Sequence, residues 1–360
     1  MDQKEFKESL IEGIKENFDE RGVEGMSFND RGGVDKLNGG YDGVVITPEG
    51  SNIGVTLNVD ALFEAYENGA TMEDVVAHAA DMAINGFENQ PEVDVTALTD
   101  YEQMKEKLVM EVVSTETNKD LLAKVPHKEV EDMSVVYRFE LGSDDNGRAT
   151  VLATNEMIAM MGITAEQLHA DAVENAPKLK PAQITGMSEV MVEMMGVTVD
   201  ELALIGMPAP ENEQMYVATV PDKIHGAGVL AYQDFMDQAA ERVGGDFFIL
   251  PSSIHEIIVV PDNGEMNLKD LEDMVKEVNA TQVSLADKLT DSVYHYDAQN
   301  KVFELGEKFV ARQAERDADI DKDEKGSVLG DLKAKRDEVA KQPKKDAVEK
   351  AAKNKGGEAI

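Results

Sequence analysis

The sequence predicts an α+β protein with mixed sheets and flanking helices, because short β-branched strand patterns alternate with amphipathic helical patterns. Its 360 residues suffice for two domains or for one large domain with an appendage, and a hydrophobic fraction of 42% supports a core. We expect four parts: a helix, antiparallel meander and helices (1–95), an α/β segment with Met-rich helical hairpins (96–213), a βαβ-containing unit (214–305), and a charged, largely disordered tail (306–360).

The first part begins with apolar residues at helical spacing over positions 4–18, which predict an amphipathic helix. Strand patterns near 23–28, 43–47 and 53–57 are separated by the turn sequences Asn38-Gly39-Gly40 and Pro48-Glu49-Gly50, which favours an antiparallel meander. Helices are expected over 60–67 and 72–84, the second with Thr71 as its N-cap.

The second part starts with a mixed pattern. Thr99 is expected to cap a helix that runs through Lys105, and residues 107–113 are expected to be extended. Strands over 134–141 and 149–154 bracket Asp144-Asp145-Asn146-Gly147, where the Asn-Gly pair is typical of a tight hairpin turn.

A near-repeat with an offset of 34 residues follows, between NEMIAMMGITAEQL (155–168) and EVMVEMMGVTVDEL (189–202). In each copy a Met-rich helix ends at a glycine, Gly162 or Gly196, and Thr164 or Thr198 then caps the next helix. We interpret the copies as helical hairpins that pack on the sheet. The flexible Met side chains could also form a groove for a peptide partner, a sharper hypothesis that stays open.

The third part follows a Gly- and Pro-containing linker at 206–213. A strand over 215–220, a helix over 229–242 and a strand over 247–250 give a βαβ-like order. A strand over 257–260, a helix over 268–278 and an extended pair near 293–296 and 301–304 complete it. Beyond Phe309 the charged, Lys-rich composition predicts a solvated tail.

Charge and composition exclude several classes of protein. The net charge is −37. Residues 301–360 are nearly neutral, with 15 basic and 14 acidic residues, so almost all of the negative charge lies in the first 300 residues. Such a strongly acidic part repels phosphate groups, and direct nucleic-acid binding by it is not expected. Mimicry of a nucleic acid is the minority interpretation. No apolar run reaches the length of a membrane span, and the N-terminus shows no signal-peptide pattern. The sequence also contains no cysteine. Together these observations predict a cytoplasmic location without membrane contact.

The most informative stretch is 246–260, in which two buried strand patterns enclose Ser252, Ser253, His255 and Glu256. Strand alternation would put Ser253 and His255 on one face, so Ser253 is the candidate nucleophile and His255 the candidate general base, with Glu256 or a distant acid tuning it. Ser252, Asn279, Thr281 and Gln282 are candidate ligand-binding residues if the segment after the last helix folds back. A Pro-initiated turn with serine hydroxyls bonded to the local backbone explains the same residues.

Three motif-like patterns fail on their spacing. His255-Glu256 lacks the second histidine of a zinc-protease motif because position 259 is valine. Residues 226–231 match the dinucleotide pattern Gly-x-Gly-x-x-Ala, but the turn before them is too long and no acid is placed for a ribose. The aspartates from 317 to 323 lack the glycine and glutamate of a calcium loop. No metal site and no cofactor are predicted.

The chain resembles a bacterial family of unknown function from Firmicutes of the gut. The most specific matching runs are Leu-Pro-Ser-Ser-Ile-His-Glu (250–256) and Val-Asn-Ala-Thr-Gln-Val (278–283), with shorter matches at 50–53, 57–58, 125–127, 132–133 and 162–168. The resemblance covers roughly residues 1–300 and implies the fold and a cytosolic setting. It carries over no catalytic residue.

Two functions remain open. The first is a cytosolic, non-enzymatic interaction or regulatory protein, because no complete catalytic constellation is present and the Met-rich helices offer a surface for a protein or peptide partner. The alternative is an enzyme or small-ligand-binding protein with its site at the turn from Ser252 to Glu256.

Overall fold

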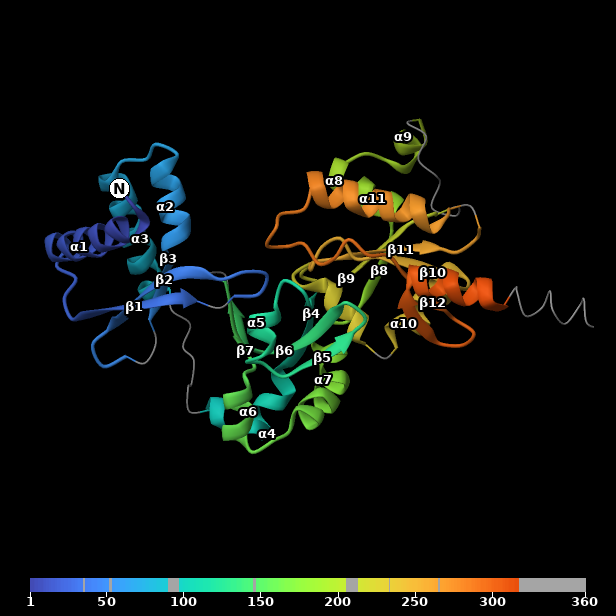
Figure 1. Cartoon of the computed structure of the whole chain (residues 1–360), viewed down its shortest axis with the longest axis horizontal. Helices are drawn as coiled ribbons and strands as arrows, with labels where there is room; N and C mark the ends of the chain where they lie inside the picture. The colour runs from blue at the N-terminus through green and yellow to red at the C-terminus, as the bar shows by residue number, and fades with distance from the viewer. Residues whose placement is uncertain are drawn as a thin grey trace, which may run out of the picture. The chain divides into compact units, whose positions relative to one another are not determined.

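The structure is a computed structural model that describes residues 1–316 apart from positions 35, 52–53, 90–96, 145–146, 205–212, 233 and 265. Among these residues, three antiparallel sheets are surrounded by helices (Figure 1), which confirms the α+β prediction. The predictions for the tail beyond 316, for most of the linker at 206–213 and for turn residues 145–146 lie outside the described residues.

The N-terminal part is the predicted meander with helices on one side. It consists of α1 (Gln3–Arg21), β1 (Met26–Val34), β2 (Tyr41–Pro48), β3 (Val55–Asn58), α2 (Val59–Glu67) and α3 (Met72–Glu88). The strands pair antiparallel in the order β1-β2-β3. Thr71 caps α3 by accepting a hydrogen bond from the backbone of Asp74, as predicted. The apolar faces of the helices bury Phe6, Leu10 and Ile14 against the sheet.

The second sheet holds β4 (Leu108–Ser114), β5 (His127–Val130), β6 (Met133–Asp144) and β7 (Gly147–Leu152). β6 pairs with all three other strands, since β4 lies on one side of it and β5 and β7 follow each other on the opposite side. Every residue of β4 is buried. Alternation sends Leu108, Met110 and Val112 into the main core, so Glu111 faces the other side of the sheet with Val113.

Short helices precede and follow these strands: η1 (Ala97–Thr99), α4 (Tyr101–Met104), η2 (Lys105–Lys107), α5 (Lys119–Leu122), α6 (Asn155–Met161) and α7 (Ala165–Leu179). The predicted cap at Thr99 is wrong. Thr99 is the last residue of η1, and the Asp100 side chain instead accepts a hydrogen bond from the backbone of Glu102 and caps α4.

The near-repeat forms two helical hairpins, α6–α7 and α8 (Met187–Met195) with α9 (Val199–Leu204). Gly162 and Gly196 end their helices with positive φ, and Thr164 and Thr198 accept hydrogen bonds at the start of the next helix, as predicted. The hairpins pack on different sheets: α7 contacts β4, whereas α8 contacts β8 (Gln183–Gly186) and β9 (Tyr216–Thr219). A groove formed by the Met side chains stays a prediction.

The third sheet has the order β13-β12-β10-β11-β9-β8, with antiparallel neighbours throughout. Its remaining strands are β10 (Phe247–Leu250), β11 (Ile257–Pro261), β12 (Tyr294–Asp297) and β13 (Val302–Leu305), and α11 spans Leu268–Thr281. β11 lies between β9 and β10 and runs opposite to both, so β9 and β10 are parallel to each other. The βαβ-like unit is thus present in a split form, with β11 inserted between its strands.

The predicted helix over 229–242 is instead a 3-10 helix, η4 (Gly226–Ala231), followed after an extended Tyr232 by α10 (Phe235–Val243). η4 begins three residues before the predicted helix, at Gly226. Its two glycines are needed there, because the backbone of Gly226 and of Gly228 lies too close to neighbouring residues for any side chain.

Contacts join Met1–Gly306 into one compact unit, while Glu307–Ile360 belong to a second, whose described residues up to 316 are helical. The proposed divisions near 95 and 213 remain predictions. Within the residues that the structure describes, no helix combines the length and the apolar character that a bilayer span requires.

Candidate functional site

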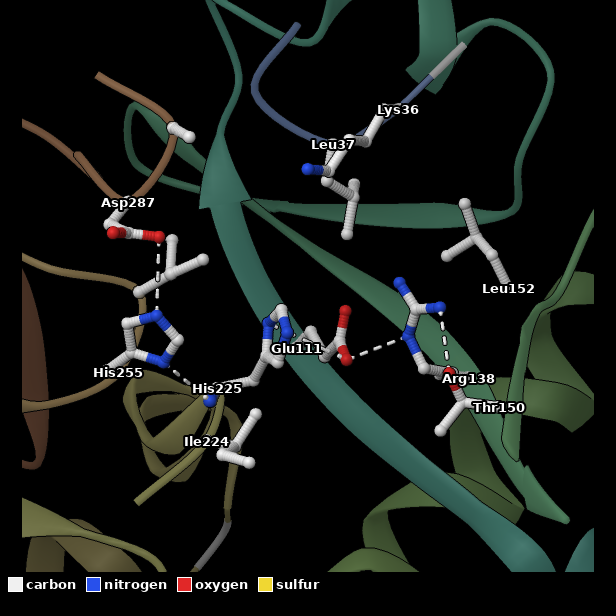
Figure 2. Close-up of a pocket in the computed structure, with 12 residues that line it drawn as sticks. Lys36, Leu37, Glu111, Arg138, Thr150, Leu152, Ile224, His225, His255 and Asp287 are labelled. Carbon is white, nitrogen blue, oxygen red and sulfur yellow. Dashed lines mark hydrogen bonds and ion pairs between the residues drawn. The ribbon is translucent and has the colours of Figure 1, made fainter. Parts of the chain in front are cut away.

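A cavity of about 640 Å³ opens beside the second sheet and includes part of the turn that the sequence singled out (Figure 2). Charged and imidazole side chains converge on it from β4, β6 and four loops. Its lining consists of Lys36, Leu37, Glu111, Arg138, Thr150, Leu152, Ile224, His225, Ile254, His255, Ala286 and Asp287.

Glu111 and Arg138 form a buried ion pair on one wall of the cavity. The Nε atom of Arg138 donates to Oε1 of Glu111 at 2.8 Å, and its Nη1 donates to Oγ1 of Thr150 at 3.3 Å. The Glu111 side chain is only 3% exposed, and its second oxygen, Oε2, is buried without a hydrogen-bond partner among the described residues. A buried carboxylate oxygen without a donor is costly, so this atom marks a place where a donor is missing.

His225 stands in front of Glu111 in the close-up of Figure 2. Its Nδ1 lies 3.7 Å from Oε1 of Glu111. Burial lowers the pKa of His225, and the facing carboxylate opposes this effect only in part, so the imidazole is neutral at neutral pH. The residue has a left-handed backbone, with φ of 56°, which is uncommon for a residue other than glycine and concentrates at functional sites.

The two glycines after His225 hold its loop in place. A Cβ on Gly226 would lie 2.1 Å from Oγ1 of Thr219 and 2.3 Å from the carbonyl oxygen of His255, and one on Gly228 would lie 2.4 Å from the carbonyl oxygen of Met110. The Gly-x-Gly pattern therefore serves close packing of the loop against β4 and against the His255 turn.

Both ring nitrogens of His255 are engaged. Nδ1 accepts a hydrogen bond from the backbone N–H of His225 at 3.2 Å, so the ring proton of the neutral form sits on Nε2, which faces Oδ1 of Asp287 at 3.3 Å. The rings of His255 and His225 lie 5.6 Å apart. His255 thus links Asp287 to the His225 loop, and its lone pair is already used.

Ser253 bonds to the local backbone, because its Oγ accepts from the backbone N–H of His255 at 3.0 Å, as the turn interpretation of the sequence requires. The contact of Ser252 is of another kind, since its backbone carbonyl accepts from the backbone N–H of Leu289, which is distant in sequence, at 3.2 Å. Neither serine lines the cavity.

The other sequence candidates lie away from the cavity. Glu256 is exposed. Asn279 is buried in α11 and donates to the carbonyl of Thr290 and to Asp291, while Thr281 donates to the carbonyl of Glu277 within the same helix. Gln282 is exposed at the end of α11. The structure therefore brings only His255 of these candidates to the cavity.

Sequence reasoning missed Glu111, Arg138, His225 and Asp287. A signal existed for Glu111, because it is a charged residue inside the otherwise apolar run 108–113. His225 carries no such signal in its neighbouring residues. Its functional setting depends on Glu111 and His255, which are distant in sequence.

A second, smaller cavity of about 270 Å³ lies between β5, α7 and α10. There His169 accepts a hydrogen bond from Lys128 at 3.1 Å and contacts the Tyr137 hydroxyl at 2.9 Å. Across the described ranges, no cluster of three or more His, Asp or Glu side chains is arranged to hold a metal ion.

Residues 3–298 match a family of unknown function, DUF5688, and the chain belongs to that family. Neither the curated proteins nor the solved structures include a match to this chain.

Proposed function

We propose that this member of a family of unknown function binds a small polar molecule in the cavity between Glu111, Arg138, His225 and Asp287. The observation that carries the proposal is the convergence of two carboxylates, a guanidinium and a neutral imidazole from separate elements on one cavity, where the wall residue Glu111 also keeps a buried oxygen, Oε2, without a hydrogen-bond donor among the described residues. At about 640 Å³ the cavity falls within the range of about 300–1,000 Å³ that is typical of small-molecule sites.

The charges around the cavity indicate the kind of molecule. Lys36 and Arg138 contribute two cations and Glu111 and Asp287 two anions, while His225 is neutral. A ligand that both donates and accepts hydrogen bonds fits this balance, whereas a highly charged anion would meet the repulsion of a chain with a net charge of −37.

The test is a thermal-shift screen of the full chain against a metabolite panel. A ligand present at about 100 times its Kd is expected to raise Tm by about 4 °C. Glu111→Gln and Asp287→Asn should each weaken this shift. Lys178→Gln, which removes an exposed ion pair with Glu174, is the matched control and should retain it.

The Asp287→Asn variant is expected to fold, because the Asp287 side chain is 42% exposed and its replacement leaves no buried charge without a partner. A lost thermal shift in this variant therefore reports on the cavity. The proposal fails if no compound stabilises the wild type, or if both cavity variants respond to every ligand as the wild type does.

A second candidate function is the binding of a peptide partner, favoured by the exposed Met194 and Met195 at the end of α8, which are 77% and 51% exposed. Leu204 of α9, 85% exposed, adds to this surface, whereas Met160 lies on α6 in the other hairpin. Methyl NMR with a captured partner tests it. Shifts of Met194 and Met195 without shifts of Met160 are expected, and equal shifts of all three would contradict a surface confined to the second hairpin.

A further inference from the structure

His225 has one ring nitrogen directed to a carboxylate and one without a partner. Nδ1 faces Glu111, whose charge is buried, while Nε2 makes no hydrogen bond to any described residue and the side chain retains 27% exposure in the cavity lining. A neutral imidazole that faces a buried carboxylate resembles the arrangement of a general base and its orienting acid. At 3.7 Å the Nδ1 and Oε1 atoms are not hydrogen-bonded in the free protein, so the role requires this contact to shorten when a substrate binds, as catalytic hydrogen bonds often do.

We infer that His225, oriented by Glu111, is a general base that activates water for the hydrolysis of small carboxylic esters bound in this cavity. The inference rests on the proposed ligand site and adds a reaction to it. In the first step Nε2 of His225 accepts a proton from water, and the water oxygen forms a bond to the acyl carbon of the ester. The carbonyl electron pair moves to oxygen and gives a tetrahedral oxyanion.

The second step returns the proton. The oxyanion collapses, the bond between the acyl carbon and the alkoxy oxygen breaks, and the alcohol leaves with the proton from the His225 imidazolium. Acid and alcohol are the products, and the imidazole is neutral again. During the reaction Glu111 stabilises the imidazolium, and the Arg138 guanidinium, anchored by Glu111 and Thr150, lies on the same wall as a cation for the oxyanion (Figure 2).

His225 suits this role and His255 does not, because both nitrogens of His255 are engaged by the His225 backbone and by Asp287. An ester fits the charges better than a phosphate monoester. Attack on an acyl carbon develops a single negative charge, whereas a phosphate monoester already carries up to two. The two cations of the cavity, Lys36 and Arg138, are matched by the two anions Glu111 and Asp287, so the cavity has no excess positive charge for a phosphate.

The experiment measures hydrolysis of 4-nitrophenyl acetate by the full chain. Replacement of a general base is expected to lower kcat/KM by about 100-fold or more, and His225→Asn tests this with a side chain that tolerates a left-handed backbone. His225→Gly suits the positive φ even better, and added imidazole should restore part of its activity beyond the rate of ester hydrolysis by imidazole without protein. His78→Asn, at an exposed position on α3, should hydrolyse the ester at the wild-type rate.

The pH profile separates catalysis from a structural role. kcat/KM should rise with pH through the pKa of His225, and Glu111→Gln should move the midpoint to lower pH, because the Glu111 carboxylate raises that pKa. Hydrolysis by the wild type that is no faster than by His225→Asn, or a His225→Gly variant that imidazole does not rescue, would overturn the inference. A thermal shift by a cavity ligand under the same conditions would then leave the binding proposal standing.

Discussion

At the scale of single residues, the site depends on close backbone approach. Gly226 lets the His225 loop contact Thr219 and the His255 carbonyl, and the His225 N–H then reaches Nδ1 of His255. Gly226 thereby fixes the separation of the two imidazoles. A substitution at this position should therefore change both the stability of the protein and the geometry of the site.

We expect Gly226→Ala to lower the free energy of unfolding by about 2 kcal/mol or more, because the new Cβ would overlap Thr219 and the His255 backbone. Urea denaturation measures this. Gly33→Ala is the matched control, since its φ is not positive and a Cβ there meets nothing within 4 Å, and a change within about 0.5 kcal/mol is expected. Equal stability of the two variants would contradict the close packing of the loop.

Burial of histidines gives a second prediction at this scale. Burial is the largest cause that lowers the pKa of His169, His225 and His295 in the folded protein. Each of them is more readily protonated in the unfolded chain, so each contributes stability above the unfolded pKa of about 6.5 that is lost as the pH falls through the lower folded pKa.

The free energy of unfolding should therefore be smaller at pH 5.5 than at pH 7.5, as measured by urea titrations. Most carboxylates stay ionised over this range and change little. His169→Gln should flatten the dependence, whereas His78→Asn, in which the histidine is exposed, should leave it unchanged. A stability that rises as the pH falls to 5.5 would contradict this account.

At the scale of elements, local sequence signals identify three helix starts correctly and one, at Thr99, incorrectly by one residue. Thr71, Thr164 and Thr198 cap helices where the sequence placed them, because a cap depends on only the next three residues. The predicted helix over 229–242 is confirmed only from Phe235 onward, where α10 begins, whereas its first residues belong to η4, whose Gly226 and Gly228 pack closely against Thr219, the His255 carbonyl and β4.

We expect Thr164→Ala to cost about 1 kcal/mol of unfolding free energy, since α7 loses the hydroxyl that accepts from Gln167. Thr281→Ala, at the last residue of α11, serves as the control. It removes a hydroxyl that bonds back to Glu277 and raises helix propensity, so a neutral or slightly stabilising effect is expected. The unfolding free energies of both variants are measured by thermal or urea denaturation. A larger loss of unfolding free energy for Thr281→Ala than for Thr164→Ala would contradict the assignment of the cap.

At the scale of the molecule, the antiparallel meander could be predicted because its strands are neighbours in sequence, joined by readable turns. The insertion of β11 between β9 and β10 could not, since the order of strands in a sheet is set by long-range pairing. For the same reason, one residue of the candidate site could be predicted from the sequence and the others could not. His255 was found within a local motif, whereas Glu111, Arg138, His225 and Asp287 meet it only through the pairing of β4 with β6 and the folding of three separate loops.

The cavity between Glu111 and Asp287, which is lined by His225 and His255, is proposed to bind a small polar molecule. The most direct test is NMR of the imidazole nitrogens, since the chain has six histidines. In the free protein, His255 should show a proton on Nε2 and His225 should be neutral at pH 7.5. Addition of a compound that raises Tm should shift the signals of His225 and His255 and leave those of His78, His127, His169 and His295 in place. Shifts confined to the other four histidines would contradict the claim.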